Sequence, residues 1–460
     1  MMNSGGRTRL LAGTAIGVYL LVIAGATAAV AAAARACGGW PLCTGSLTEP
    51  AHLIAVAHRG IAAAVGLLVL VTAVAVFQST ARRRVKGCMA VALALYPVQI
   101  VLGGLLASAG GVEPVPGLHL IVGLTIFGLV VLALAWDLEA LTGTEERQSV
   151  RHPDDPSGTA APARSVDPNP ELRTRLLAYI RLTKPRLMWL LSLVAAAAMA
   201  VAATVAPDGL TVRTIILTLG GGVLAIGASG TFNHVLERDV DRRMARTADR
   251  PVATDVVSVR RATAFGFALA TLSLATFWLI NPLAAGLGLV AILFYSVIYT
   301  LVLKPNTVQN TVIGGAAGSL PALIGWAAVT GQIALPGIVL AGVIFVWTPA
   351  HFYNLALAYR EDYARGGFPM MPVVRGATET RKHILLWLAA TLSASAALLR
   401  VTPLSWVTAI ATVVLGSIFL AAVVHLHRER TESAALRAFH ASNAYLGLFL
   451  LAIVVDALAV

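Results

Sequence analysis

Long apolar runs separated by short polar segments dominate the chain. Thirteen of these runs come close to the roughly 20 residues that an α-helix needs to cross a bilayer. Four lie in the first third of the chain, near 10–34, 52–77, 88–109 and 118–136. Nine follow, near 187–206, 214–232, 262–280, 283–303, 312–329, 337–357, 384–399, 406–426 and 443–459. The pattern predicts an all-α polytopic membrane protein with about 13 transmembrane helices.

A polar stretch rich in helix breakers separates the two sets of runs. It contains His152-Pro-Asp-Asp-Pro-Ser-Gly and Asp167-Pro-Asn-Pro, which are too polar to enter lipid and are typical of a linker. We therefore predict a four-helix domain at 1–137, a cytoplasmic linker at 138–178 and a nine-helix domain at 179–460.

The composition agrees with a membrane protein. The chain is 58% hydrophobic and only 12% charged, whereas soluble domains carry about 25% charged residues. The net charge of +12 does not indicate nucleic-acid binding, because the lysines and arginines gather in alternate loops. If the N-terminus is cytoplasmic, the outer loops hold only Arg35, Arg213 and Arg400, as the positive-inside rule requires. The sequence thus predicts a multi-pass cell-membrane protein with a cytoplasmic N-terminus and a C-terminus outside.

The most distinctive polar segment, 233–251, follows an apolar run on the predicted cytoplasmic side. Asn233, Glu237 and Asp241 are four residues apart, so they would stack along one flank of a helix. Carboxylate and amide oxygens suit Mg²⁺, which usually shares its ligands with substrate phosphates. Arginines suit the remaining phosphate oxygens, and five are interleaved here: Arg238, Arg242, Arg243, Arg246 and Arg250. The alternative is a solvated charged loop between two spans.

A second acidic pair, Glu361 and Asp362, follows another apolar run on the same predicted side. The two acidic segments would face each other across one cavity and hold Mg²⁺ on a shared diphosphate. A diphosphate at the membrane interface, with its tail in an apolar cavity, indicates an isoprenoid diphosphate. Mg²⁺ and arginines would stabilise the leaving diphosphate, and a nucleophile would capture the allylic carbocation. The predicted reaction is therefore prenyl transfer.

Residues 179–459 resemble the protoheme IX farnesyltransferases, or heme O synthases, of the UbiA-type prenyltransferase superfamily. The resemblance rests on Leu182-Thr-Lys-Pro-Arg186, the segment 233–251, Tyr299-Thr-x-x-Leu-Lys304, Asn310-x-x-Ile-Gly-Gly-Ala-Ala-Gly318, and His351-Phe with Asp362-Tyr-Ala-Arg-x-Gly-x-Pro-Met-x-Pro372. It implies nine helices around a cavity and a Mg²⁺-dependent transfer of farnesyl from farnesyl diphosphate to a vinyl group of heme b, giving heme O for terminal oxidases. It also implies catalytic, metal-binding roles for Asn233, Glu237, Asp241 and Asp362. The basic residues expected near the diphosphate are Lys184, Arg242, Arg246 and Lys304.

Two histidines mark the N-terminal domain. His58 and His119 lie near the outer ends of the second and fourth apolar runs, so both imidazoles sit at a similar depth. Histidine is rare within membrane spans and usually functional, and neutral imidazole is a common metal ligand. The pair would ligate one heme iron axially; the alternative is two satisfied core histidines. His52 lies closer to the predicted surface and is set aside.

The outer loop after the first run carries Cys37 and Cys43, with glycine and proline between them. On the oxidising side of a membrane such a pair can close a disulfide that persists. Free thiols are the alternative. Cys88, at a cytoplasmic helix start, has no partner in the sequence pattern.

Residues 8–137 resemble one four-helix half of the heme A synthases, through the cysteine loop, His58-Arg59 and His119. Ala55 stands where that family has a glutamate associated with oxidation of the heme methyl group. Two interpretations stay open: a domain that binds or hands over heme b without oxidising it, or one that acts as a dimer. The resemblance also suggests a heme A synthase or oxidase assembly factors as protein partners.

Two rival functions remain at the level of sequence. One is a UbiA-type enzyme with a quinone-precursor or lipid acceptor. The other is a heme-binding membrane carrier without chemistry, for which the acidic residues would be dispensable.

Overall fold

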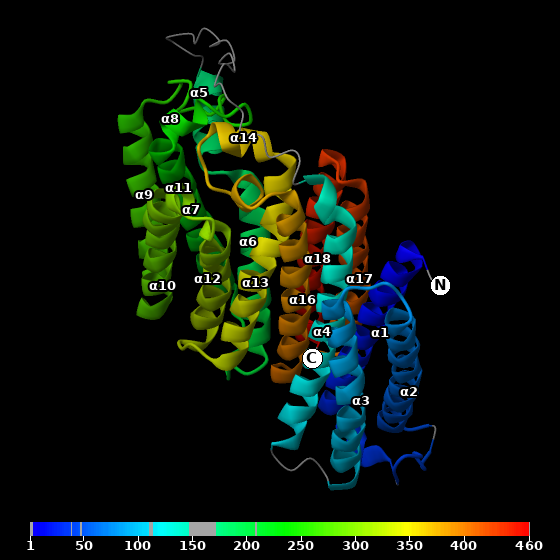
Figure 1. Ribbon diagram of the computed structural model, residues 1–460. Helices are drawn as coiled ribbons and strands as arrows, with labels where there is room; N and C mark the ends of the chain where they lie inside the picture. The colour runs from blue at the N-terminus through cyan, green and yellow to red at the C-terminus, as the bar shows by residue number, and fades with distance from the viewer. Residues whose placement is uncertain are drawn as a thin grey trace. The chain divides into compact units, whose positions relative to one another are not determined.

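The computed structural model describes residues 3–37, 39–46, 48–109, 114–146, 172–207 and 209–459. Across these ranges the regular secondary structure is helical (Figure 1). Within them, twelve segments are long and apolar enough to cross a membrane, which confirms the predicted fold class of about 13 spans. The expected span near 262–280 is long enough but falls short of that hydropathy. It is helix α9 (Val259–Trp278), which has Arg260 and Arg261 in its first turn and carries several hydroxyl side chains.

The chain forms two compact units. Unit 1 comprises Met1–Arg147 and Arg381–Ala452, and unit 2 comprises Gln148–Thr380 and Ile453–Val460. Most of the predicted linker, residues 147–171, lies outside the described residues. The domain boundaries expected from the sequence stay a prediction. The two units are defined by which residues are close in space, whereas the predicted domains are continuous segments of the sequence.

Unit 1 contains the N-terminal helices and most of the C-terminal ones. Its elements are α1 (Ser4–Val30), the 3-10 helix η1 (Ala33–Ala36), α2 (Pro50–Phe77), α3 (Arg83–Ala109), α4 (Val115–Glu146), α16 (Ala377–Val401), α17 (Trp406–Glu429) and α18 (Glu432–Ala459). Helix α1 packs against α2, α4 and α17. The helices are apolar all round, so their pairing depends on close packing and on a few buried polar contacts.

Buried hydroxyl and ionic contacts specify these pairings. Tyr19 Oη of α1 lies 2.8 Å from Thr412 Oγ1 of α17. Arg7 Nε donates to Asp137 Oδ1 at 2.6 Å, and Thr8 Oγ1 donates to Asp137 Oδ2 at 2.9 Å. Because a buried polar group without a partner is costly, these contacts favour one register of α1 against α4 and α17.

Unit 2 holds the remaining helices. Its elements are α5 (Leu172–Leu182), α6 (Pro185–Ala203), α7 (Val212–Leu236), α8 (Arg238–Asp241), α9, α10 (Pro282–Leu293), the π-helix η2 (Phe294–Leu303), α11 (Lys304–Asn306), α12 (Asn310–Thr330), α13 (Leu335–Ala358), α14 (Arg360–Arg365) and α15 (Met371–Val374). The closest packing joins α7 with α9 and α12 with both α6 and α13. The short helices α8 and α14 lie at the same end of the unit as α5 (Figure 1).

Small residues allow the helices of unit 2 to approach closely. Phe277 of α9 is fully buried, and a Cβ at Gly221 of α7 or at Gly288 of α10 would come within 2.9 Å or 2.6 Å of its ring. A Cβ at Gly325 of α12 would lie only 2.4 Å from the carbonyl oxygen of Ala195 on α6. Glycine at these contacts is what membrane helix packing requires.

Candidate functional site

The three polar side chains of the first acidic segment gather at one end of unit 2. Asn233 lies in the last turn of α7, Glu237 caps that helix and Asp241 ends the short helix α8. All three are buried, with 2%, 5% and 2% of their surface exposed. The backbone of Glu237 (φ −97°, ψ 6°) leaves the helical region. The expectation of one continuous helix flank was therefore wrong, although the three residues do share one end of the bundle.

Two of these side chains are paired with lysines from other helices. Lys184 Nζ donates to Asn233 Oδ1 and, at 3.3 Å, to Tyr295 Oη. Lys304 Nζ donates to Glu237 Oε1 at 2.5 Å. Both lysines were predicted to lie near a bound diphosphate, and the structure places each beside a predicted metal ligand.

The third side chain, Asp241, is paired with Arg250. Arg250 Nη1 lies 2.8 Å from both carboxylate oxygens of Asp241 and 3.7 Å from Glu237 Oε2. The sequence prediction did not single out Arg250, because five arginines spaced along one loop look alike before the loop is folded. We refer to Asn233, Glu237, Asp241, Lys184, Lys304 and Arg250 as the charge cluster.

Burial and neighbouring charges oppose each other in the charge cluster. Burial lowers the pKa of Lys184 to about 7, and the nearby Arg250 adds to the effect. Burial also raises the pKa of Asp241, although Arg250 counteracts it. Burial acts to raise the pKa of Glu237 as well, but Lys304 and Lys184 outweigh it and hold that pKa below its usual value. Because the cluster is buried and poorly solvated, a further multiply charged group would interact strongly with it.

An unusual backbone conformation aims Lys184 at the cluster. Its φ and ψ of 53° and 59° lie in the left-handed region, directly before Pro185. That region costs a residue with a side chain roughly 1–2 kcal/mol, and such strain persists only where the surroundings fix it. Gly230 of α7 makes room, because a Cβ there would lie 3.0 Å from the Leu182 carbonyl oxygen and 3.2 Å from Lys184 Cγ.

Asp362 of α14 lies against the backbone that follows Asp241. Its carboxylate accepts hydrogen bonds from the backbone N–H groups of Ala245 (2.8 Å) and Arg246 (3.1 Å), and it pairs with Arg365 at 2.6 Å. Burial acts to raise the pKa of Asp362, but these hydrogen bonds hold it below its usual value. The structure therefore places Asp362 beside the loop that follows the first acidic segment. The expectation that the two acidic segments face each other across one cavity stays a prediction.

The two arginines predicted to bind phosphate point to different partners. Arg246 Nη2 donates to Tyr363 Oη at 3.1 Å, and its guanidinium carbon lies 5.1 Å from the centre of the Tyr359 ring. Arg242 Nη2 pairs with Asp255 at 2.7 Å, in the loop that follows α8. Arg246 thus borders the loop that Asp362 fixes, whereas the role expected for Arg242 stays a prediction.

An apolar cavity of about 260 Å³ reaches the charge cluster. Lys184 and Tyr295, which are hydrogen-bonded to each other, both line it. The rest of the wall comes from α6, α7, α9, α10, η2, α12 and α13, and includes Leu191, Phe277, Tyr299, Ile324 and Phe352. The arrangement offers an apolar chain a space that ends at a group of buried charges.

The π-helix η2 connects the cavity with the cluster. Thr300 Oγ1 donates to the carbonyl oxygen of Tyr295, five residues earlier, at 2.8 Å, and accepts from Asn233 Nδ2 at 3.2 Å. The same element carries Tyr295 and Tyr299 on the cavity wall and ends directly before Lys304. π-helical turns are frequent at functional sites, and this one was not foreseen from the sequence.

The two predicted heme ligands of unit 1 lie in a region lined by glycine. A Cβ at Gly25 would lie 3.2 Å from His58 Cε1, and a Cβ at Gly103 would lie 3.3 Å from His119 Cε1. Gln99 Nε2 lies 3.4 Å from His119 Nε2. The Nδ1 atoms of both histidines are buried, and neither has a hydrogen-bond partner among the described residues. Buried polar atoms are normally paired, so these rings suit a site that a ligand completes.

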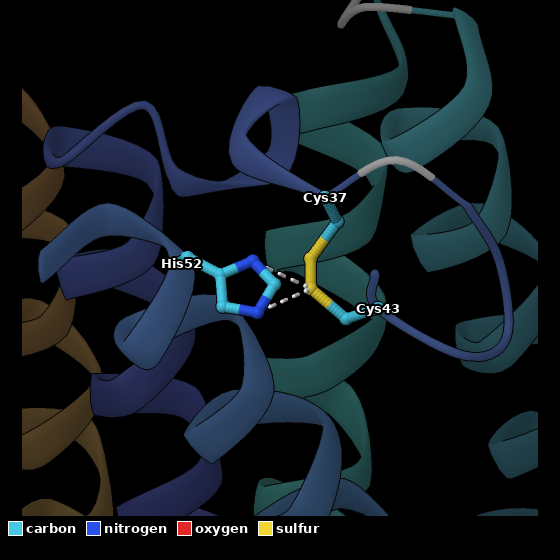
Figure 2. A group of neighbouring side chains, drawn as sticks. All are labelled: Cys37, Cys43 and His52. Atoms are coloured by element: carbon cyan, nitrogen blue, oxygen red, sulfur yellow. Dashed lines mark hydrogen bonds between the residues drawn. A yellow bond between two sulfur atoms is a disulfide. The ribbon is translucent and has the colours of Figure 1, made fainter. Parts of the chain in front are cut away.

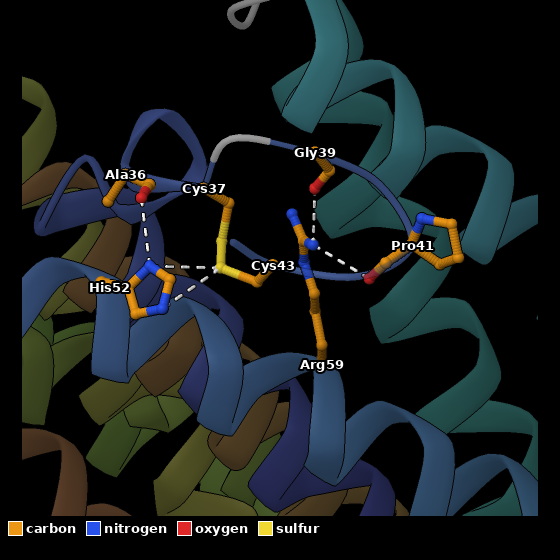
Figure 3. The surroundings of a disulfide bond; sticks show 7 residues. All are labelled: Ala36, Cys37, Gly39, Pro41, Cys43, His52 and Arg59. Atoms are coloured by element: carbon orange, nitrogen blue, oxygen red, sulfur yellow. Dashed lines mark hydrogen bonds between the residues drawn. A yellow bond between two sulfur atoms is a disulfide. The ribbon is translucent and has the colours of Figure 1, made fainter. Parts of the chain in front are cut away.

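The loop between η1 and α2 contains a disulfide between Cys37 and Cys43 (Figure 3). Their Cα atoms are 4.8 Å apart, within the usual range for disulfides. Arg59 of α2 donates to the carbonyl oxygens of Gly39 (2.8 Å) and Pro41 (3.0 Å), which lie between the two cysteines (Figure 3). The loop is thus held both by the disulfide and by an arginine clamp.

Known proteins resemble this chain closely. Residues 190–452 match the UbiA prenyltransferase family. Over 98% of both chains, the sequence is 61% identical to a Haloarcula marismortui protein named protoheme IX farnesyltransferase. It is 59% identical, over 100% of both chains, to protoheme IX farnesyltransferase 1 of Natronomonas pharaonis. A solved structure from work on digeranylgeranylglyceryl phosphate synthase in membranes shares the fold, with a TM-score of 0.52 and 16% identity over 62% of this chain and 100% of that one.

Proposed function

The chain belongs to the UbiA prenyltransferase family, and from this premise we propose that it transfers a farnesyl group from farnesyl diphosphate to a vinyl group of heme b, giving heme O. The observation that carries the proposal is the junction of the charge cluster with the apolar cavity, where Lys184 and Tyr295 belong to both. The names of the relatives that match nearly the whole chain support farnesyl and heme as the substrates.

The oxygen donors of the site fit Mg²⁺. Asn233, Glu237 and Asp241 offer an amide oxygen and two carboxylates, which are hard ligands of the kind that Mg²⁺ prefers. An ionised carboxylate has about four acceptor positions, and the three hydrogen bonds and ion pairs of Asp362 leave room for a further partner. We propose these four residues as the metal ligands. Bound Mg²⁺ would neutralise the charge that develops on the departing diphosphate.

The cations of the cluster would bind the diphosphate itself. Lys184, Lys304 and Arg250 occupy the oxygens that would ligate the metal. If those oxygens held a metal, the three cations would be free to bind the diphosphate oxygens, and Arg246 would reach them from the adjoining loop. Exchange of partners keeps every buried charge paired, which matters because an unpaired buried charge is costly.

The cavity would hold the farnesyl chain and protect the reactive carbocation. Loss of diphosphate leaves an allylic cation, and the rings of Tyr295 and Tyr299 on the cavity wall can stabilise it through their π faces. The apolar wall excludes water, which would otherwise consume the cation. The vinyl group of heme b supplies the electrons for the new carbon–carbon bond, and water quenches the charge left beside the porphyrin ring.

The N-terminal helices would add a heme-binding site. His58 and His119 would hold the iron of heme b through two imidazoles, and the unpaired buried nitrogens with the glycines beside the rings support this assignment. Ala55 replaces the residue that the heme A synthases associate with methyl oxidation, so we propose binding or transfer of heme and not its oxidation. A heme A synthase or oxidase assembly factors are the protein partners that this role suggests.

The proposed orientation places the N-terminus in the cytoplasm. The charge cluster would then lie at the cytoplasmic surface, because the loops around it carry most of the arginines. The disulfide loop and the C-terminus would face outside.

Acceptor choice tests the proposed function. Membranes containing the protein are incubated with farnesyl diphosphate, Mg²⁺ and either heme b or 4-hydroxybenzoate. We expect a farnesylated product from heme b and none from the benzoate, and removal of Mg²⁺ with a chelator should stop the reaction because the diphosphate charge is no longer neutralised. A product from the benzoate alone would instead establish a quinone-type enzyme, and no product from either would favour the carrier.

A further inference from the structure

His52 of α2 lies directly beside the disulfide. Its side chain is buried, with 1% of its surface exposed. Its Nδ1 atom lies 3.2 Å from the carbonyl oxygen of Ala36 and 3.4 Å from Cys43 Sγ, and its Nε2 atom lies 4.0 Å from the same sulfur (Figure 2). The imidazole of His52 therefore faces the two sulfur atoms of the disulfide.

The contact with Ala36 sets the tautomer of this ring. A carbonyl oxygen only accepts hydrogen bonds, so Nδ1 of neutral His52 carries the proton and donates it to Ala36. Nε2 then keeps a free lone pair. Histidines that bind metals are usually held in this way, with the other ring nitrogen donating to a carbonyl or a carboxylate.

The three side chains match the size of a small metal site. One ligand atom from each of Cys37, Cys43 and His52 lies within 4.8 Å of the others. Around an ion with metal–sulfur bonds of about 2.3 Å and metal–nitrogen bonds of about 2.0 Å, ligand atoms stand roughly 3.5–4.0 Å apart. The imidazole is already near this separation, and only the two bonded sulfurs must move apart.

Contacts other than the disulfide also hold the loop. Arg59 is seven residues after His52, nearly two helical turns, so both project from one side of α2. While His52 faces the sulfurs, Arg59 binds the carbonyl oxygens of Gly39 and Pro41 (Figure 3). Gly45 leaves space for the ring, because a Cβ there would lie 2.5 Å from His52 Nδ1. Two cysteines released from each other would thus stay close to the imidazole.

We propose that reduction of the Cys37–Cys43 disulfide creates a binding site for one thiophilic d¹⁰ cation, Zn²⁺ or Cu⁺, with Cys37, Cys43 and His52 as ligands. A dithiol donor supplies two electrons and two protons and becomes a disulfide itself, and the two cysteine thiols release those protons when they bind the metal as thiolates. Thiolate and imidazole ligands select these ions over Mg²⁺. The loop is then a redox-gated metal site: closed by a sulfur–sulfur bond when oxidised, and open to a metal when reduced.

Metal retention by the full-length protein in detergent tests the proposal. The protein is reduced anaerobically with a phosphine, desalted, loaded with Zn²⁺ or with Cu⁺ and freed of loose metal, and the retained metal is measured by mass spectrometry. We expect about one equivalent on the reduced protein and less than about one tenth on the oxidised protein. Cys37→Ser and Cys43→Ser should each lose the metal, and His52→Ala should bind it about 10–100-fold more weakly in competition with a chelator.

Cys88→Ser is the matched control, because Cys88 is the free, buried cysteine of α3 and is not near the proposed ligands. It should retain about one equivalent. Elution as a single symmetric peak in size exclusion shows that each variant is folded, and alkylation of the reduced wild type should show two thiols that the metal protects. The proposal is overturned if the reduced wild type retains neither ion, if Cys43→Ser retains as much as the wild type, or if the metal is lost with Cys88→Ser.

Discussion

Replacing Asp241 with Asn should lower kcat/KM for farnesyl transfer to heme b by about 10³-fold, equal to about 4 kcal/mol, while the protein still inserts into the membrane. Asp241 is 2% exposed and both of its carboxylate oxygens face Arg250. Asn keeps the shape of the side chain but removes its charge, so the proposed Mg²⁺ site loses a ligand and Arg250 loses its counter-ion. The measurement is the transfer of labelled farnesyl to heme b in membranes that contain equal amounts of each variant.

Asp239→Asn provides the matched control. Asp239 lies on the same short helix, but its side chain is 87% exposed and its contact with Arg242 is 3.9 Å long. Exposed ion pairs contribute little, so we expect activity within about twofold of the wild type. Equal losses in Asp239→Asn and Asp241→Asn would point to a general effect of charge in this loop, and would contradict a specific ligand role for Asp241.

If the N-terminal helices bind heme b as proposed, replacing His119 with Ala should lower the heme content from about one equivalent to nearly none, because the iron would lose one of its two imidazole ligands. Farnesyl transfer by the charge cluster should persist, since none of its six residues lies in unit 1. The measurement is the low-spin bis-histidine absorption spectrum of the purified protein, read together with its heme content.

His425→Ala is the control for this variant. His425 lies on α17 of the same unit, is half exposed and pairs with Glu429 at 2.7 Å. We expect its heme content and spectrum to equal those of the wild type. An unchanged spectrum in both His58→Ala and His119→Ala would show that the two rings do not hold heme, and would leave their unpaired nitrogens without an explanation.

The sequence was sufficient to predict features that depend on residues close together in the chain. Apolar runs of helical length predicted the membrane fold, and the α9 segment fell short only because its arginines and hydroxyl groups lower its mean hydropathy. The spacing of Asn233, Glu237 and Asp241 predicted one shared location, and Asp362 was expected near them. The contact of Asp362 with the backbone of Ala245 and Arg246 agrees with that expectation.

The sequence was insufficient to predict which charged side chains pair with each other, because the pairing depends on how the loops fold. The helix ends at Glu237, so the direction of Asp241 depends on a bend that the four-residue spacing does not encode. Arg250 became the partner of Asp241 because the loop turns back on itself, whereas Arg242 turned toward Asp255. The π-helix before Lys304 has no signature in an apolar sequence.

His52 shows the same limitation in the N-terminal helices. It was set aside because it stands near the end of an apolar run, where side chains usually meet water or lipid headgroups. In the structure the loop that carries Cys37 and Cys43 folds over the end of α2 and buries the ring. The burial of His52 depends on the conformation of this loop, which the hydrophobic pattern of the helices does not predict.

The most direct test of the central claim, that the charge cluster and the apolar cavity together farnesylate heme b, is mass spectrometry of the hemes extracted from a host that lacks its own heme farnesyltransferase. Expression of the wild-type chain should produce heme O, and expression of Asp241→Asn to the same level should leave heme b unchanged. Heme b as the sole product of a wild-type chain that is correctly inserted and supplied with farnesyl diphosphate would contradict the account.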